Sequence, residues 1–136
     1  MTQRTPAENR VLLDALQLAI AVGVVVALSQ TWWVVFDQDG GNDHPKSGWS
    51  GLGTSTYAQG WPVILGVVAA VVAVALCSRA LHGVAAIVAG LATVVMLVSL
   101  VNVDHYSGYD VTSGVWVGFG LLVATTLTQI AWFATE

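Results

Sequence analysis

Residues 61–103 read WPVILGVVAAVVAVALCSRALHGVAAIVAGLATVVMLVSLVNV, and this stretch decides the fold. It holds two apolar runs, 61–78 and 83–103, which the short segment 79–82 separates. A helix needs about 20 residues to cross a hydrocarbon core of about 30 Å, and each run is close to that length. Because backbone groups in lipid must pair within their own segment, the stretch predicts two antiparallel transmembrane helices joined by a tight turn.

Two further apolar runs lie on either side of this hairpin, at residues 11–36 and 115–134. Thr5, Pro6 and Glu8 have the spacing of a capping box, with Thr5 as N-cap and Pro6 at the first helical position. We therefore expect one all-α domain, an integral membrane four-helix bundle with up-down-up-down topology. Its predicted helices are 6–36, 61–78, 83–103 and 114–134, with outer loops at 37–60 and 104–113 and a cytoplasmic turn at 79–82.

The composition of the chain points to a lipid environment. Of its 136 residues, 56% are apolar and 9% are charged, whereas soluble domains carry about 25% charged residues. The chain has too few charged residues to form the surface of a water-soluble globular protein. The lipid bilayer is therefore the expected partner. The net charge of −4 and the scattered cations exclude a nucleic-acid partner. The single cysteine, Cys77, is expected to pack as a small hydrophobic residue.

The cations predict the orientation of the four spans. Arg4, Arg10 and Arg79 fall on one side of the layout, and Lys46 falls on the other. Cytoplasmic segments carry an excess of Lys and Arg, so both termini and the 79–82 turn are expected in the cytoplasm of a multi-pass plasma-membrane protein. Trp132 lies near the inner edge of the last span, where we expect it to anchor the helix in the membrane surface.

A few polar residues interrupt the apolar spans. Asp14 follows Arg10 by one helical turn, so an ion pair between the two side chains is expected near the cytoplasmic boundary. Gln17 lies on the same face, and if helices one and four are neighbours it can hydrogen-bond with Gln129 across them. His82 lies in the predicted turn and is expected to contact a helix end or a headgroup. The other polar residues at this depth of helix four are Thr125 and Thr128.

Small residues recur at four-residue spacing along the helices. Gly114 and Gly118 form a GxxxG motif at the start of the last helix. Such spacing lets two helix backbones approach closely. Both internal packing and docking onto a partner helix would use it, so both readings stay open. The other small-residue pairs and stripes are Gly66 and Ala70, Ala86 and Gly90, and Gly120, Ala124 and Thr128.

The first outer loop carries an acidic cluster that predicts a candidate metal site. Its aspartates alternate with other residues and are followed by glycines, which suits a calcium loop, although the spacing and terminal glutamate of an EF-hand are missing. Two histidines lie on the same side of the predicted membrane layout, so zinc or copper are further candidates for the bound metal ion. A solvated acidic loop without metal is the alternative. The candidate ligands are Asp37, Asp39, Asp43, His44 and His105.

Several short motifs carry a family resemblance. They are Thr31-Trp32-Trp33 after the first span, Gly60-Trp61-Pro62 before the second, the Arg79 turn, and a glycine-rich last helix. Together they resemble the tryptophan-associated family of small four-span membrane proteins of actinobacteria. The resemblance implies an actinobacterial plasma-membrane setting, and the family has no established reaction to transfer.

The sequence contains no known catalytic constellation, so we expect neither an enzyme nor a cofactor. The preferred interpretation is a non-enzymatic accessory or structural subunit that docks into a larger respiratory or transport complex of the plasma membrane. Its expected partners are other membrane-protein subunits, with a homo-oligomer as a further option. One alternative is a small transporter or channel component that uses Asp14. Another is an outer-face cation-binding or sensing module.

Overall fold

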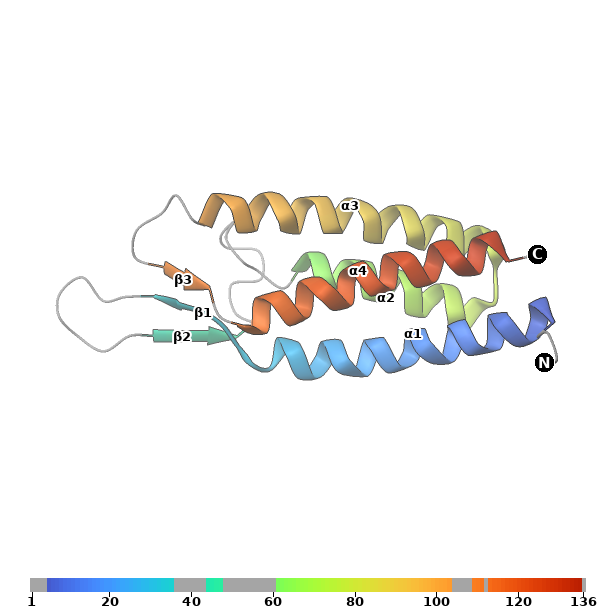
Figure 1. Cartoon of the computed structure of the whole chain (residues 1–136), viewed down its shortest axis with the longest axis horizontal. Coiled ribbons are helices and arrows are strands. Elements are labelled where there is room, and N and C mark those ends of the chain that lie inside the picture. Colours follow the sequence, from blue (N-terminus) through green and yellow to red (C-terminus); the bar gives the residue numbers. More distant parts are fainter. Residues whose placement is uncertain (1–4, 36–43, 48–60, 104–108, 112, 136) are drawn as a thin grey trace.

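The computed structural model describes residues 5–35, 44–47, 61–103, 109–111 and 113–135. Within these ranges four helices run side by side along the long axis, and a small antiparallel sheet lies at one end (Figure 1). Both termini lie at the other end, as an up-down-up-down bundle requires. The four predicted helices are confirmed, and the sheet is an element that the sequence analysis missed. The elements are α1 (Pro6–Leu28), β1 (Thr31–Val35), β2 (His44–Ser47), α2 (Trp61–Leu76), α3 (Arg79–Val103), β3 (Tyr109–Val111) and α4 (Ser113–Ala134).

Helix α1 begins as the sequence predicts. The Glu8 backbone N–H donates to Thr5 Oγ1 at 3.2 Å, and the Thr5 backbone N–H donates to Glu8 Oε2 at 3.2 Å. These reciprocal bonds pair two N–H groups that the first helical turn would otherwise leave free. The predicted capping box is therefore confirmed.

The end of α1 was predicted wrongly. The helix stops at Leu28 with Ser29 as its C-cap, whereas the apolar run suggested a helix to residue 36. Residues 31–35, TWWVV, instead form β1, the central strand of the sheet. Aromatic and β-branched residues favour strands, and a continuous apolar run does not reveal by its pattern where a helix gives way to a strand.

The sheet closes the end of the bundle opposite the termini. β1 pairs antiparallel with β2, placing Val35 opposite His44, and antiparallel with β3, placing Val35 opposite Tyr109. The strand order β2-β1-β3 joins parts of both predicted outer loops to the segment that follows α1.

The turn between α2 and α3 is shorter than predicted. Ser78 caps α3, because its hydroxyl accepts from the Leu81 backbone N–H at 3.4 Å, so residues 79–82 form the first turn of α3. Cys77 makes the reversal with a φ of 51°, a left-handed conformation that is uncommon outside glycine. It is exposed, so the expectation that it packs as a buried hydrophobic residue is wrong.

Helices α2 and α4 each pack against all three of the other helices. The closest approach surrounds Gly66 on α2, where an added Cβ would lie 2.6 Å from Leu122 Cδ1 and 3.2 Å from Ala89 Cα. A larger residue at position 66 would have to push α2 away from α3 and α4.

The predicted small-residue stripes take different positions in the bundle. Gly114 and Gly118 are both buried within the chain, while Gly120 is exposed. On α3 the innermost small residues are Ala85 and Ala89, each one position before the predicted pair. The burial of Gly66, Ala70, Gly114 and Gly118 shows that these four residues serve internal packing.

The outside of the bundle is apolar. α1 and the segments Arg79–Leu100 and Gly114–Ala134 are long enough to cross a membrane, with mean hydropathies of 2.5, 2.4 and 1.6. Large apolar side chains on all four helices are about half exposed or more, among them Val22 at 66%, Leu76 at 64%, Leu91 at 64% and Leu127 at 61%. α2 is shorter, with 16 residues or about 24 Å. Within the described residues, three helices are therefore long and apolar enough to cross a membrane, and the fourth is apolar but shorter.

Candidate functional site

The interior of the bundle has two parts with different chemistry. Toward the sheet, the core contains apolar side chains such as Val24, Met96 and Val115. Toward the termini, five polar side chains are at most 5% exposed. They come from α1, α3 and α4, so three helices meet at this end through polar groups. These residues are Gln17, His82, Thr125, Thr128 and Gln129.

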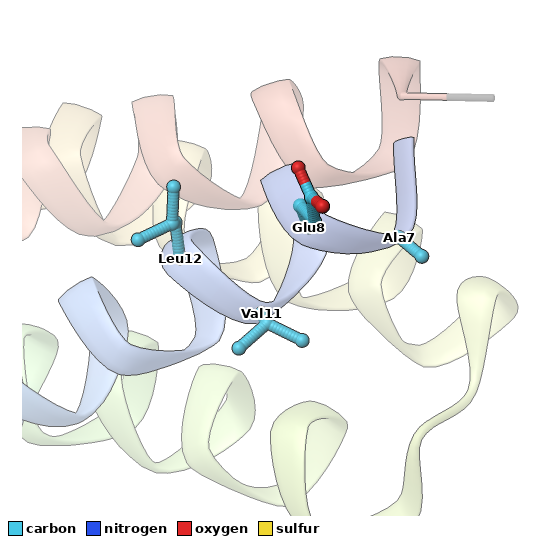
Figure 2. A pocket seen from close by; sticks show the side chains of 4 residues that line it. All are labelled: Ala7, Glu8, Val11 and Leu12. Carbon is cyan, nitrogen blue, oxygen red and sulfur yellow. The ribbon is translucent and has the colours of Figure 1, made fainter. Parts of the chain in front are cut away.

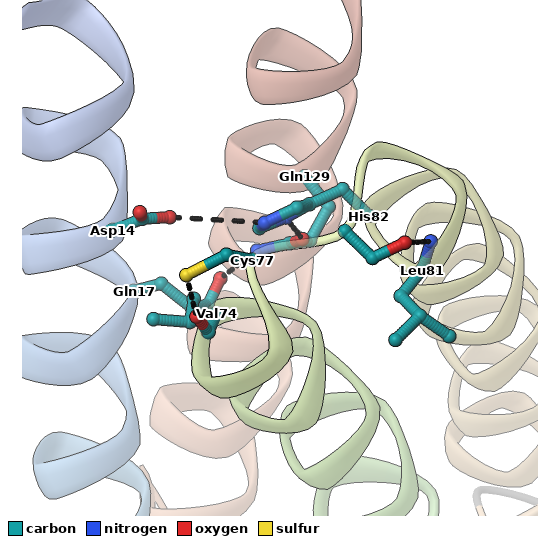
Figure 3. A network of polar contacts seen from close by, with 8 residues as sticks. Asp14, Gln17, Val74, Cys77, Leu81, His82 and Gln129 are labelled. Carbon is teal, nitrogen blue, oxygen red and sulfur yellow. Dashed lines mark hydrogen bonds and ion pairs between the residues drawn. The ribbon is translucent and has the colours of Figure 1, made fainter. Parts of the chain in front are cut away.

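Four of these side chains form one continuous chain of contacts, and Figure 3 labels three of them, His82, Gln129 and Gln17. His82 Nδ1 lies 2.6 Å from Gln129 Oε1, and the Gln129 amide N–H donates to Gln17 Oε1 at 3.0 Å. The Gln17 amide N–H in turn donates to Thr125 Oγ1 at 3.3 Å. The predicted polar contact between α1 and α4 is thereby confirmed, and the structure adds His82 to it.

Asp14 lies at the open end of this polar chain. Its Oδ1 is 3.9 Å from Nε2 of His82, and its side chain is 30% exposed while that of His82 is fully buried. A separation of 3.9 Å is longer than a hydrogen bond, so the two atoms face each other without being bonded. Among the described residues, neither atom has another hydrogen-bond partner.

The expected ion pair between Arg10 and Asp14 is wrong. One guanidinium nitrogen of Arg10 donates to the Thr135 carbonyl at 2.7 Å, and the group lies 5.0 Å from the centre of the Trp132 ring. The last carbonyls of a helix have no partner within the helix, and a cation there is also favoured by the helix dipole. Arg10 therefore binds the end of α4, which leaves Asp14 to His82.

Trp132 forms one wall of the site. Its ring stacks on the His82 imidazole, with centroids 3.7 Å apart and planes 12° from parallel, and the residue is 7% exposed. The expectation that Trp132 anchors the bundle from its surface is therefore wrong. On α4 it follows Thr125 by seven residues and Gln129 by three, a spacing that places all three on the same inward face.

Unpartnered polar atoms concentrate at this site. Within the described ranges, the buried side-chain nitrogens and oxygens without a hydrogen-bond partner are Arg10 Nε, Asp14 Oδ1, His82 Nε2 and Trp132 Nε1. Because most buried polar groups in proteins are paired, four unpaired ones beside each other need an explanation. In a low-dielectric interior, unpaired polar groups are energetically costly. A proton or small ligand that gave them hydrogen-bond partners would therefore bind favourably at this site.

A second arginine also binds the end of α4. Arg79 donates to the Phe133 carbonyl at 3.2 Å and lies 5.2 Å from the Phe133 ring centre. Arg10 and Arg79, from α1 and α3, thus pair with the Thr135 and Phe133 carbonyls at the same helix end. The cations that suggested the orientation of the chain also have a structural role in joining three helices.

His82 is the functional candidate that the sequence analysis missed. It was expected to lie in the turn and contact a helix end or a headgroup, but it lies in the first turn of α3 and is fully buried. One signal was available in the sequence. His82 precedes Ala85 and Ala89 by three and seven residues, the spacing of one inward helical face, and Ser78 is a suitable N-cap one turn earlier.

The candidate metal site lies mostly outside the described residues. Asp37, Asp39, Asp43 and His105 belong to that part of the chain, and His44 lies in β2. Within the residues that the structure describes, no three His, Cys, Asp or Glu side chains come together as metal ligands would. The outer metal site remains a prediction.

Several hollows on the surface of the described helices lie apart from the polar site. The first is a shallow depression on the first turns of α1, lined by Ala7, Glu8, Val11 and Leu12 (Figure 2). It is made by one helix, and its carboxylate already serves the capping box. The second, which we call the α1–α2 groove, has an almost entirely apolar lining. Its residues are Ala21, Val24, Val25, Leu28, Ile64, Val67, Val68, Val71 and Val72.

Compared with known proteins, the chain matches no family model, no curated protein sequence and no solved structure. The resemblance to the tryptophan-associated family therefore stays a prediction from short motifs.

Proposed function

We propose that the chain is an integral plasma-membrane protein with four spans and both termini in the cytoplasm. The observation that carries this proposal is the apolar surface of the bundle. Valine, leucine and isoleucine cover the outside of all four helices, while the buried glutamine and histidine side chains at one end pair within the protein. In water such a surface would aggregate, but in lipid it is the stable arrangement, because polar groups then pair within the protein.

A cysteine-labelling experiment tests the orientation. Cys77 is exposed in the turn near the termini and is the only cysteine of the chain. In intact cells a membrane-impermeant maleimide should leave Cys77 unlabelled until the membrane is permeabilised. The matched variant, Lys46→Cys in a Cys77→Ser chain, places the thiol in β2 and should be labelled without permeabilisation. Equal labelling of the two positions in intact cells would contradict the topology.

Within the membrane we propose a non-enzymatic accessory role, in which the chain docks onto a helix of a larger respiratory or transport complex. The support comes from α2. At about 24 Å it is shorter than the hydrocarbon core of about 30 Å, and a short span is accommodated by association with other helices, among other ways. The α1–α2 groove lies along this helix and offers an apolar surface to a partner helix.

Site-specific photo-crosslinking tests this docking. A photoreactive residue at Val68, which is 53% exposed in the α1–α2 groove, should crosslink to one defined membrane protein in native membranes. The matched control is Leu91, which is 64% exposed on α3 outside the groove, and should give no adduct with that protein. Adducts with lipid alone at both positions would overturn the accessory role while leaving the membrane topology intact.

A second candidate is a small transporter or channel component that works through Asp14. The observation in its favour is the buried Oδ1 of Asp14 facing His82. The polar chain ends at Thr125, however, and the described core beyond it is apolar. A complete path would therefore need a second copy or a partner subunit. In reconstituted vesicles, proton or ion flux that is unchanged by Asp14→Asn would dispose of this candidate.

A further inference from the structure

We propose that Asp14 and His82 together form a binding site for one proton, and that the bound proton ties α1 to α3. The site goes beyond the accessory and transport functions and depends on neither. The geometry that carries it is the pair of buried, unpartnered atoms, His82 Nε2 and Asp14 Oδ1, at 3.9 Å.

The direction of the polar chain sets the tautomer of His82. The amide nitrogen of Gln17 donates to Thr125, and the amide nitrogen of Gln129 donates to Gln17. Gln129 therefore presents its oxygen to His82, and that oxygen can only accept. With the two amides in this orientation, the 2.6 Å contact requires a donor on His82, so we assign the imidazole hydrogen to Nδ1.

In the neutral imidazole, the other ring nitrogen, Nε2, then carries no hydrogen and cannot donate. Nε2 presents a lone pair, and an ionised Asp14 also presents lone pairs, so two acceptors face each other. One added proton turns this unfavourable contact into a hydrogen bond, with N–H donating to the carboxylate or the carboxylic acid donating to Nε2. A hydrogen bond of about 2.8 Å is shorter than the 3.9 Å separation, so binding would bring the Asp14 carboxylate and the His82 imidazole about 1 Å closer together.

The other charged groups near the site have partners of their own, so Asp14 and His82 are the two groups that can bind the proton. α1 contributes Arg10 and Asp14, and the guanidinium of Arg10 is engaged by Thr135 and the Trp132 ring. α3 contributes Arg79, which binds the Phe133 carbonyl. Cys77 in the adjoining turn contacts the Val74 carbonyl. α2 and α4 contain no ionisable side chain.

The site holds its proton rather than passing it on. Asp14 is 30% exposed, so a proton can enter there, whereas His82 is fully buried under the Trp132 ring. Beyond Gln129, Gln17 and Thr125 the described core is apolar. The expected behaviour is reversible protonation from the side on which the termini lie.

The tautomer can be tested on the native sequence, using ¹⁵N NMR of histidine-labelled protein in detergent micelles. His44→Gln and His105→Gln variants identify the His82 signals. Across the pH range in which the bundle stays folded, Nδ1 should remain protonated, and Nε2 should be the nitrogen that gains and loses a proton. Titration at Nδ1, or no titration of His82 at all, would overturn the proposal without any change to the site.

The role of the carboxylate is tested by Asp14→Asn. An amide at this position can no longer share the proton as a carboxylate does, so the ¹⁵N chemical shift of His82 Nε2 should differ from that of the wild type while Nδ1 stays protonated. Glu8→Gln, which removes an exposed carboxylate from the same helix, is the matched control and should leave the Nε2 signal unchanged. An identical Nε2 signal in wild type and Asp14→Asn would contradict a shared proton. Because these measurements need no partner, they succeed or fail independently of the crosslinking experiment.

Discussion

The two halves of the bundle interior are held together by different physics. In the half next to the sheet, side chains such as Val24, Met96 and Leu100 fill space and have no directional partner. In the half next to the termini, His82, Gln129 and Gln17 are joined atom by atom in one order. The apolar half therefore depends on volume, whereas the polar half depends on the identity of each donor and acceptor.

This difference decides what each half can tolerate. Volume-conserving exchanges among apolar residues usually cost little. In the polar half, replacing one member leaves its neighbours buried without a partner, and that penalty exceeds the net contribution of the bond itself. The function that we assign to the polar half follows from the same property, because an acceptor pair without a donor is a place for a proton.

The largest expected effect is in the apolar half. Met96 is fully buried, so Met96→Ala should leave a cavity and lower the free energy of unfolding by about 3 kcal/mol. Unfolding by SDS titration from mild detergent micelles measures this. Leu97→Ala, at a neighbouring position that is 50% exposed, is the control and should change the free energy far less. Equal losses would mean that the apolar half is not tightly packed.

A smaller effect is expected when the polar chain is broken. Gln129→Leu keeps a side chain of similar size but leaves His82 Nδ1 and Gln17 Oε1 unpaired, which should cost about 2 kcal/mol in the same titration. The control is Thr128→Val, because the Thr128 hydroxyl donates to the Ala124 carbonyl of its own helix. If both substitutions were neutral, the polar half would be held by volume like the other half, and the comparison would fail.

The smallest effect is expected where helix backbones come close. Gly66→Ala places a Cβ 2.6 Å from Leu122 Cδ1 and 3.2 Å from Ala89 Cα, and the resulting overpacking should cost about 1 kcal/mol. Gly120→Ala, with nothing within 4 Å of its added Cβ, should instead stabilise α4 by a few tenths of a kcal/mol or more. A loss of stability at position 120 as large as that at position 66 would show that close packing is not the cause.

Local features of the sequence predicted much of the helical framework. The apolar runs located four helices, and the capping box at Thr5 and Glu8 located the start of α1 within one turn. The contact between Gln17 and Gln129 was also predicted, because two amides at similar depth on neighbouring helices have few other partners. The end of α1 and the position of His82 were not predicted. A continuous apolar run does not show where a helix gives way to a strand, and the sequence of a turn does not show whether its residues are buried in the bundle or exposed.

Short-range sequence patterns located the four helices, though not the end of α1, because such patterns depend on residues within a few positions of each other. The bonds of the capping box, for example, join residues three apart. The tertiary structure alone decided the polar site. His82 and Gln129 lie 47 positions apart, and Gln17 and Gln129 lie 112 apart. Which acceptor meets which donor over such separations depends on how the helices pack, and the tautomer of His82 and the free face of Asp14 follow from that packing.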